Sequence, residues 1–156
     1  ERDRRSGTQN VAGIVAMAAA AAATVAGRAD TVARVGALRD RLVDRLRAAV
    51  GDLDETVPDR SAKVAGNAHL CIGGVVSEEL LFLLDAGGVC ASAASSCASG
   101  AVQLSHVLGA MGVERDRGAG AVRLSLGWCS TEADVDAAVV AIAEAVCRLR
   151  AAGRGR

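Results

Sequence analysis

The chain has 156 residues, a length that suits one domain, or one domain with a piece of another attached. It is 51% hydrophobic, but alanine supplies much of that share, and one Phe and one Trp are the only aromatic residues. Eighteen basic residues balance 18 acidic ones, which argues against a nucleic-acid partner, because nucleic-acid-binding proteins carry a basic excess or a basic face.

The first ten residues, ERDRRSGTQN, contain no initiator methionine and no start of a helix or strand. We therefore expect the chain to be cut from a longer protein. The next 17 residues, 11–27, are uncharged and alanine-rich. Alanine is too weakly apolar to favour lipid, so we expect a closely packed helix over 10–26 and no membrane span. Thr8 or Asn10 can cap this helix, and Gly27 can end it.

A second helix is predicted from residue 30 or 31 to residue 50, ending at Gly51. Its apolar residues recur at intervals of three and four, which is typical of an amphipathic helix. Residues 52–66 contain the only proline and predict an exposed connection, with Lys63 at its surface. The predicted apolar face of the helix consists of Val35, Leu38, Leu42, Leu46 and Ala49.

Strands are predicted over 67–73, 89–92 and 121–127, and short helices from Ser77 and over 105–112. A last helix begins after Ser130 or Thr131, either of which can cap it. This order predicts an α+β fold, in which two long helices precede a small sheet that is covered by helices on one side. The apolar stripe of the last helix is Val135, Val139, Ile142, Val146 and Leu149.

Cys97 is the first candidate for chemistry, because it lies in the segment CASAASSCASG among small residues that leave a thiol accessible. The alternative is a small residue in a close-packed turn. A metal site of Cys90, Cys97 and His106 fits no usual ligand spacing, and Cys90 lies in a predicted strand, where we expect it to face inward. No metal is therefore predicted. An odd number of cysteines without a secretory leader indicates a reducing cytoplasm, and we assign Cys71, Cys129 and Cys147 to packing.

Arg123 interrupts an apolar strand, and it either binds a carboxylate in a cleft or lies on the solvent face of the sheet. Thr8, in RRSGT, precedes a helix start, where backbone amides favour a phosphate. His69 and His106 are isolated, and we interpret each as a structural hydrogen-bonding residue.

In order and spacing, several segments together resemble the C-terminal half of a cysteine desulfurase. These segments are RRSGTQNVAGIVAM, AGNAHLCIGGVVSEELLFLLDAGGVCASAASSCASG, SHVLGAMGV and AVRLSLGWCSTEADVD. The resemblance extends from Arg4 to about Leu149. Cysteine desulfurases are pyridoxal-phosphate enzymes of the class V aminotransferase group, with fold type I.

The resemblance implies a mostly antiparallel small domain at residues 28–156, with residues 1–27 as a remnant of the large cofactor domain and a connecting helix. It implies that Cys97 is the catalytic thiolate, that Arg123 binds the substrate carboxylate and that Thr8 reaches the cofactor phosphate, typically in the neighbouring subunit. The lysine that carries pyridoxal 5'-phosphate would lie upstream, so the chain by itself would be inactive. Ala94 replaces a glycine of the family, and Leu104 replaces a proline.

The expected activity is sulfur transfer from L-cysteine to Cys97 as a persulfide, with release of alanine. The expected partners are a second copy of the protein and a sulfur-acceptor or scaffold protein for iron–sulfur clusters, thiolated RNA or thio-cofactors, with no nucleic acid or membrane. A selenocysteine lyase and a truncated, non-catalytic dimerisation or docking domain are the alternatives.

Overall fold

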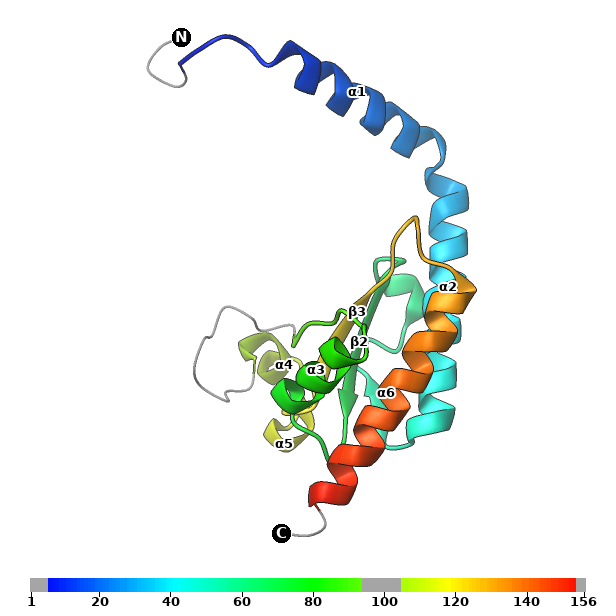
Figure 1. Ribbon diagram of the computed structural model, residues 1–156, viewed down its shortest axis with the longest axis vertical. Helices are drawn as coiled ribbons and strands as arrows, with labels where there is room; N and C mark the ends of the chain where they lie inside the picture. Colours follow the sequence, from blue (N-terminus) through cyan, green and yellow to red (C-terminus); the bar gives the residue numbers. More distant parts are fainter. Residues whose placement is uncertain (1–5, 94–104, 154–156) are drawn as a thin grey trace.

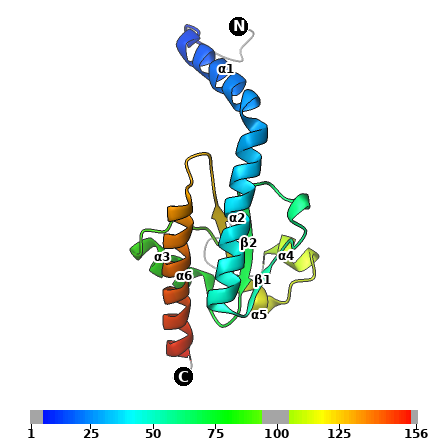
Figure 2. The ribbon, with the colours of Figure 1, turned by 90° about the vertical axis from the view of Figure 1, so that its right-hand side faces the viewer.

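The computed structural model describes residues 6–93 and 105–153 of the chain, and it shows helices packed around one small sheet (Figures 1 and 2). Two long helices come first, and a third long helix closes the described chain. The elements in chain order are α1 (Val11–Ala26), α2 (Arg28–Val50), β1 (Leu53–Glu55), the 3-10 turn η1 (Arg60–Ala62), β2 (Asn67–Ile72), α3 (Ser77–Ala86), α4 (His106–Ala110), α5 (Arg115–Gly118), β3 (Ala121–Ser125) and α6 (Glu132–Gly153).

The three strands pair in the order β1-β2-β3, and both pairs are antiparallel. Leu53 of β1 lies opposite Ile72 of β2, and His69 of β2 lies opposite Arg123 of β3. An isolated bridge between Ser92 and Arg123 adds a short fourth segment at the free edge of β3. The predicted α+β fold, a small antiparallel sheet preceded by two long helices, is confirmed.

Helices α2 and α6 lie side by side over one face of the sheet, and α3 packs against α6 (Figure 2). Successive side chains of a strand point to opposite faces, so Ala68, Leu70 and Ile72 of β2 all enter this layer and are fully buried. The predicted apolar stripes of both long helices face the same core. The stripe members within this core are Leu38, Leu42 and Leu46 of α2 and Val135, Val139, Ile142 and Val146 of α6.

Helix α1 projects away from the rest of the chain, and its axis is bent by 69° from that of α2 (Figure 1). The Asn10 side chain caps it by accepting a hydrogen bond of 2.9 Å from the Gly13 N–H, and Gly27 follows its last residue. None of its 16 residues is buried, so the close packing expected of this helix does not occur within the described chain.

Among the described residues, no single helix is both long and apolar enough to cross a membrane. The bent pair α1 and α2 would be so only when taken together, by length and composition alone.

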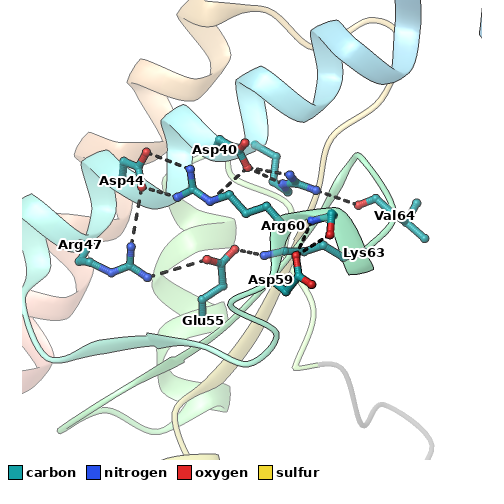
Figure 3. Close-up of polar contacts among 10 residues, drawn as sticks. Asp40, Asp44, Arg47, Glu55, Asp59, Arg60, Lys63 and Val64 are labelled. Atoms are coloured by element: carbon teal, nitrogen blue, oxygen red, sulfur yellow. Dashed lines mark hydrogen bonds and ion pairs between the residues drawn. The ribbon is translucent and has the colours of Figure 1, made fainter. Parts of the chain in front are cut away.

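The prediction of an exposed connection over residues 52–66 is wrong for β1 and for Lys63, whereas residues 58–59 and 61–62 are exposed as expected. Leu53 and Glu55 of β1 are buried, because this strand pairs with β2 along the edge of the core. Lys63 is not at the surface but forms an ion pair with Glu55, and the two side chains are only 8% and 3% exposed (Figure 3). A strand of three residues is too short for its alternation to stand out from a polar loop.

Two further local predictions are wrong. Residues 89–92 form no named strand but only the bridge at Ser92. Ser77 is the first residue of α3 rather than its cap, and its hydroxyl instead donates to the backbone carbonyls of Ala119 and Ala121. In both places long-range pairing with the segment around β3 decides the local structure.

Candidate functional site

Arg123 lies on the face of the sheet that points away from α2 and α6. Its neighbours Val122 and Leu124 are buried in the core, so the alternation of β3 places the Arg123 side chain on the opposite, exposed side. Within residues 6–93 and 105–153 this side chain has no hydrogen bond or ion pair. The Arg123 side chain is thus exposed among the described residues, and its guanidinium fork can bind an anion.

His69 lies directly opposite Arg123 on the same face and is half-buried. Its Nδ1 atom is 2.6 Å from the Oγ1 atom of Thr56. Burial and, second, the positive charge of Arg123 lower the pKa of His69 below its ordinary value of 6.5. The imidazole is therefore neutral at pH 7. The structural hydrogen bond expected for His69 is present, and its partner is Thr56.

Thr56 connects His69 with a buried thiol. Its Oγ1 atom is 3.8 Å from the Sγ atom of Cys71, and its backbone N–H donates to the carbonyl of His69 at 3.1 Å. Cys71 packs in a small cluster with Leu108 and Ala121. Burial is the main reason that the pKa of Cys71 is raised, so this thiol keeps its proton and is no nucleophile.

Cys97, the predicted nucleophile, lies outside the described residues. The structure does describe the chain segment that leads to it, because Ser92 pairs with Arg123 through two backbone hydrogen bonds of 2.7 and 3.1 Å. In sequence Cys97 follows Ser92 by five residues. Arg123 therefore lies beside the strand end from which the segment carrying Cys97 continues.

Thr8 is exposed just ahead of α1, and the structure does not bring it near Arg123. The 16 residues of α1 alone span about 24 Å, and the helix points away from the sheet (Figure 1). Within one chain the two predicted binding residues thus belong to different regions.

Lys63 is the only lysine of the chain, and its ammonium group is occupied by Glu55 in the buried ion pair. It offers no free amine for a covalent link to an aldehyde cofactor. Among the described residues no group of three or more His, Cys, Asp or Glu side chains could hold a metal ion.

Three of the four described cysteines differ from the sequence-based assignments. Cys129 and Cys147 are exposed rather than packed, and Cys90, expected to face inward, is exposed as well. Cys71 is buried as expected. Cys90 and Cys129 lie outside the helices and strands, where the amphipathic pattern predicts no burial. Cys147 lies on α6, outside the apolar stripe of that helix.

Thr56 is the residue that sequence reasoning missed. It follows β1, and the whole segment read as a polar connection, so nothing indicated that its hydroxyl faces His69. The available signal was the alternation Leu53-Asp54-Glu55-Thr56, in which Leu53 and Glu55 turn out to be buried.

Comparisons with known proteins agree with this fold. The family model described as aminotransferase class-V matches residues 1–138. The chain is 47% identical over 152 residues to an IscS-like cysteine desulfurase of Mycobacterium tuberculosis, an alignment that covers 97% of this chain and 39% of that protein. It is 37% identical over 150 residues to the cysteine desulfurase IscS of Methanosarcina thermophila, which covers 96% of this chain and 37% of that protein.

Two solved structures have the same fold. A NifS-like protein aligns with a TM-score of 0.75 and 31% identity over 90% of this chain and 34% of its own. A NifS-like protein from Rickettsia africae aligns with a TM-score of 0.73 and 26% identity over 90% of this chain and 36% of its own.

The small helix-covered sheet and the matched residues together define the class: the chain belongs to the aminotransferase class-V family. Within that family, the two curated relatives named above are cysteine desulfurases, so the resemblance predicted from the sequence is confirmed. The chain spans less than two fifths of the length of those relatives.

Proposed function

We propose that this chain is the C-terminal part of a pyridoxal-phosphate-dependent cysteine desulfurase. The observation that carries the proposal is Arg123, an exposed arginine without a partner in the described chain, next to the strand end that leads to Cys97. A guanidinium in this setting suits the carboxylate of an amino-acid substrate. The 47% identity to an IscS-like cysteine desulfurase supports L-cysteine as that substrate.

The proposed division places residues 1–27 with a large cofactor domain and residues 28–156 in a small domain. The absence of any buried residue in α1 supports a boundary at Gly27, because an apolar helix of this length is stable in water only when something covers it. The bend of 69° between α1 and α2 falls at the same glycine.

The described residues fit the cofactor only in part. Thr8 and the start of α1 offer a hydroxyl and backbone amides of the kind that bind a phosphate, whereas Lys63 is held by Glu55 and cannot carry the aldehyde. The attachment lysine would come from the large domain. Pyridoxal phosphate, when bound, withdraws electrons from the carbon skeleton of the amino acid.

The residues of this chain would then act as follows. Arg123 binds the substrate carboxylate and orients the substrate. The Cys97 thiolate attacks the substrate sulfur, so that a new S–S bond forms while the bond between that sulfur and the substrate β-carbon breaks. The electron pair of the broken bond stays with the carbon, which takes up a proton, and the product leaves as alanine. Cys97 keeps the sulfur as a persulfide, which an acceptor thiol can attack.

The proposed assembly is a homodimer, because Thr8 and Arg123 do not meet within one chain. An arrangement in which α1 reaches the neighbouring subunit would bring both residues to one cofactor. The outer sulfur of the Cys97 persulfide would pass to an acceptor or scaffold protein for iron–sulfur clusters, thiolated RNA or thio-cofactors. The free, exposed thiols of Cys90, Cys129 and Cys147 support a reducing, cytoplasmic location.

The decisive experiment compares Cys97→Ala with Cys90→Ala in the full-length protein. We expect Cys97→Ala to retain cofactor absorbance but to release no sulfide from L-cysteine, since no thiolate remains to take the sulfur. Cys90→Ala, which removes an exposed thiol seven positions earlier, should retain activity. Sulfide release by Cys97→Ala at the wild-type rate would refute the proposed role. Wild-type activity on selenocysteine without activity on cysteine would identify a selenocysteine lyase instead.

A further inference from the structure

Three residues form one row across the sheet on the face away from α2 and α6. Thr56, just beyond β1, donates its backbone N–H to the carbonyl of His69 in β2, and His69 is the direct cross-strand neighbour of Arg123 in β3. Side chains in such opposite positions start from Cβ atoms about 5 Å apart. The row thus brings a hydroxyl, an imidazole and a guanidinium together on one open surface.

The hydrogen bonds at one end of the row permit a tautomer of His69 that carries its hydrogen on Nε2. Cys71 is buried and keeps its proton, so its thiol can donate to the Oγ1 atom of Thr56. With that thiol as donor, the Thr56 hydroxyl can donate its own hydrogen to the Nδ1 atom of His69, which is 2.6 Å from Oγ1. A neutral imidazole that accepts at Nδ1 carries its hydrogen on Nε2. In this tautomer His69 is an N–H donor beside Arg123.

The other end of the row has a positive charge that the described chain does not neutralise. Asp54 of β1 lies opposite Cys71 on the same face, and it is paired with Arg117. Arg123 has no ion pair among residues 6–93 and 105–153. A guanidinium and a neutral N–H donor on adjacent strands can each bind one oxygen of the same anion. The pair therefore suits an anion with two acceptor oxygens better than an anion with one.

We propose that His69 is a second carboxylate-binding residue, whose Nε2–H donates to the same substrate carboxylate that Arg123 binds. The proposal rests on the proposed function for the identity of that substrate as an amino acid. Thr56 is a positioning residue in this arrangement, because its hydroxyl holds the ring in place and keeps the hydrogen on Nε2. His69 adds selectivity for a carboxylate without adding a second positive charge.

The test measures how strongly the full-length protein prefers L-alanine, which has a carboxylate, to L-alaninamide, which has none, by calorimetric titration of each. We expect the wild-type protein to prefer L-alanine. His69→Phe keeps an aromatic ring but removes the donor, and it should reduce the preference about tenfold, as expected for a hydrogen bond to a charged group. Arg123→Ala should reduce the preference by more.

Two conservative variants separate binding from packing. Thr56→Val keeps the shape but removes the hydroxyl, so it should lower the preference for L-alanine, whereas Thr56→Ser should retain it. A loss of packing alone would weaken the binding of L-alanine and of L-alaninamide equally, so the ratio of the two affinities would not change. An unchanged ratio in His69→Phe, or no preference in the wild-type protein, overturns the proposal. The titration measures binding and requires no turnover. A wild-type protein that releases no sulfide would therefore refute the proposed function, while the binding preference for L-alanine would still test the role of His69.

Discussion

Glu55 and Lys63 show how a single charge pair ties a short strand to the body of the protein. Both side chains are nearly inaccessible, at 3% and 8% exposed, and a guanidinium nitrogen of Arg47 lies 3.8 Å from the Glu55 carboxylate (Figure 3). Removal of one partner from a buried pair leaves an uncompensated charge, which costs about 3–5 kcal/mol, whereas replacement of both partners by apolar residues is often neutral.

We therefore expect Lys63→Met to lower the midpoint of chemical denaturation, by the equivalent of about 3 kcal/mol, the lower end of the range for buried pairs, because Arg47 still offers partial compensation. The double variant Glu55→Leu with Lys63→Met should recover most of the loss. Urea denaturation followed by circular dichroism measures both. A double variant that is less stable than Lys63→Met would contradict this account of the pair.

Cys71 gives a second prediction for a single residue. Burial raises the pKa of its thiol and removes it from solvent, so we expect it to resist iodoacetamide at pH 8 in the native protein. After unfolding in guanidinium chloride it should be alkylated at the rate of an ordinary thiol. Mass spectrometry of the peptide that contains Cys71 compares the two states, and rapid native labelling would show that the strand β2 is accessible.

At the scale of the elements, α6 owes its start to a reciprocal cap. The Thr131 backbone N–H and hydroxyl both donate to a carboxylate oxygen of Asp134, and the Asp134 backbone N–H donates to the Thr131 hydroxyl at 3.2 Å. The hydroxyl hydrogen bond from Thr131 is the main reason that the pKa of Asp134 lies below its ordinary value of 3.8. A lowered carboxyl pKa stabilises the fold above pH 3.8, and this contribution is lost as the pH falls through the lowered pKa.

Thr131→Ala removes the capping oxygen, and we expect it to cost about 1 kcal/mol of stability. Thr131→Ser keeps an oxygen in the same place and serves as the matched control. The midpoint of urea denaturation at pH 7 measures both variants. Equal midpoints for Thr131→Ala and the wild-type protein would mean that packing of α6 on α2, and not the cap, sets the start of the helix.

In the molecule as a whole, helix α1 stands out because no other part of the described chain covers it. Its apolar side chains are largely in solvent, with Met17 and Val25 each 71% exposed. Under the proposed domain division this helix packs against the large cofactor domain. We therefore expect slow hydrogen exchange at the α1 amides in the full-length protein, measured by mass spectrometry of peptides from residues 11–26. Exchange at the rate of an unstructured peptide would contradict that division.

The long helices could be predicted because their signals are local. The three- and four-residue spacing of Val35, Leu38, Leu42 and Leu46 places these residues on one face wherever the helix lies, and all four are buried. Asn10 and Gly27 act within a turn of the helix end that they mark. Ala49 of the same predicted face is exposed, because the buried face at the end of α2 continues from Leu46 to Val50, which packs against the core.

The amino-acid pattern was enough to predict the family, the strands β2 and β3, the long helices and the position of Arg123 on an alternating strand. The folded chain was needed to find that β1 pairs with β2, that Lys63 is buried against Glu55 and that Thr56, His69 and Arg123 form one row. The physical reason is the range of the interactions. Periodicity and capping act between neighbours along the chain, whereas strand pairing and buried charge pairs join residues whose separation in the sequence carries no pattern.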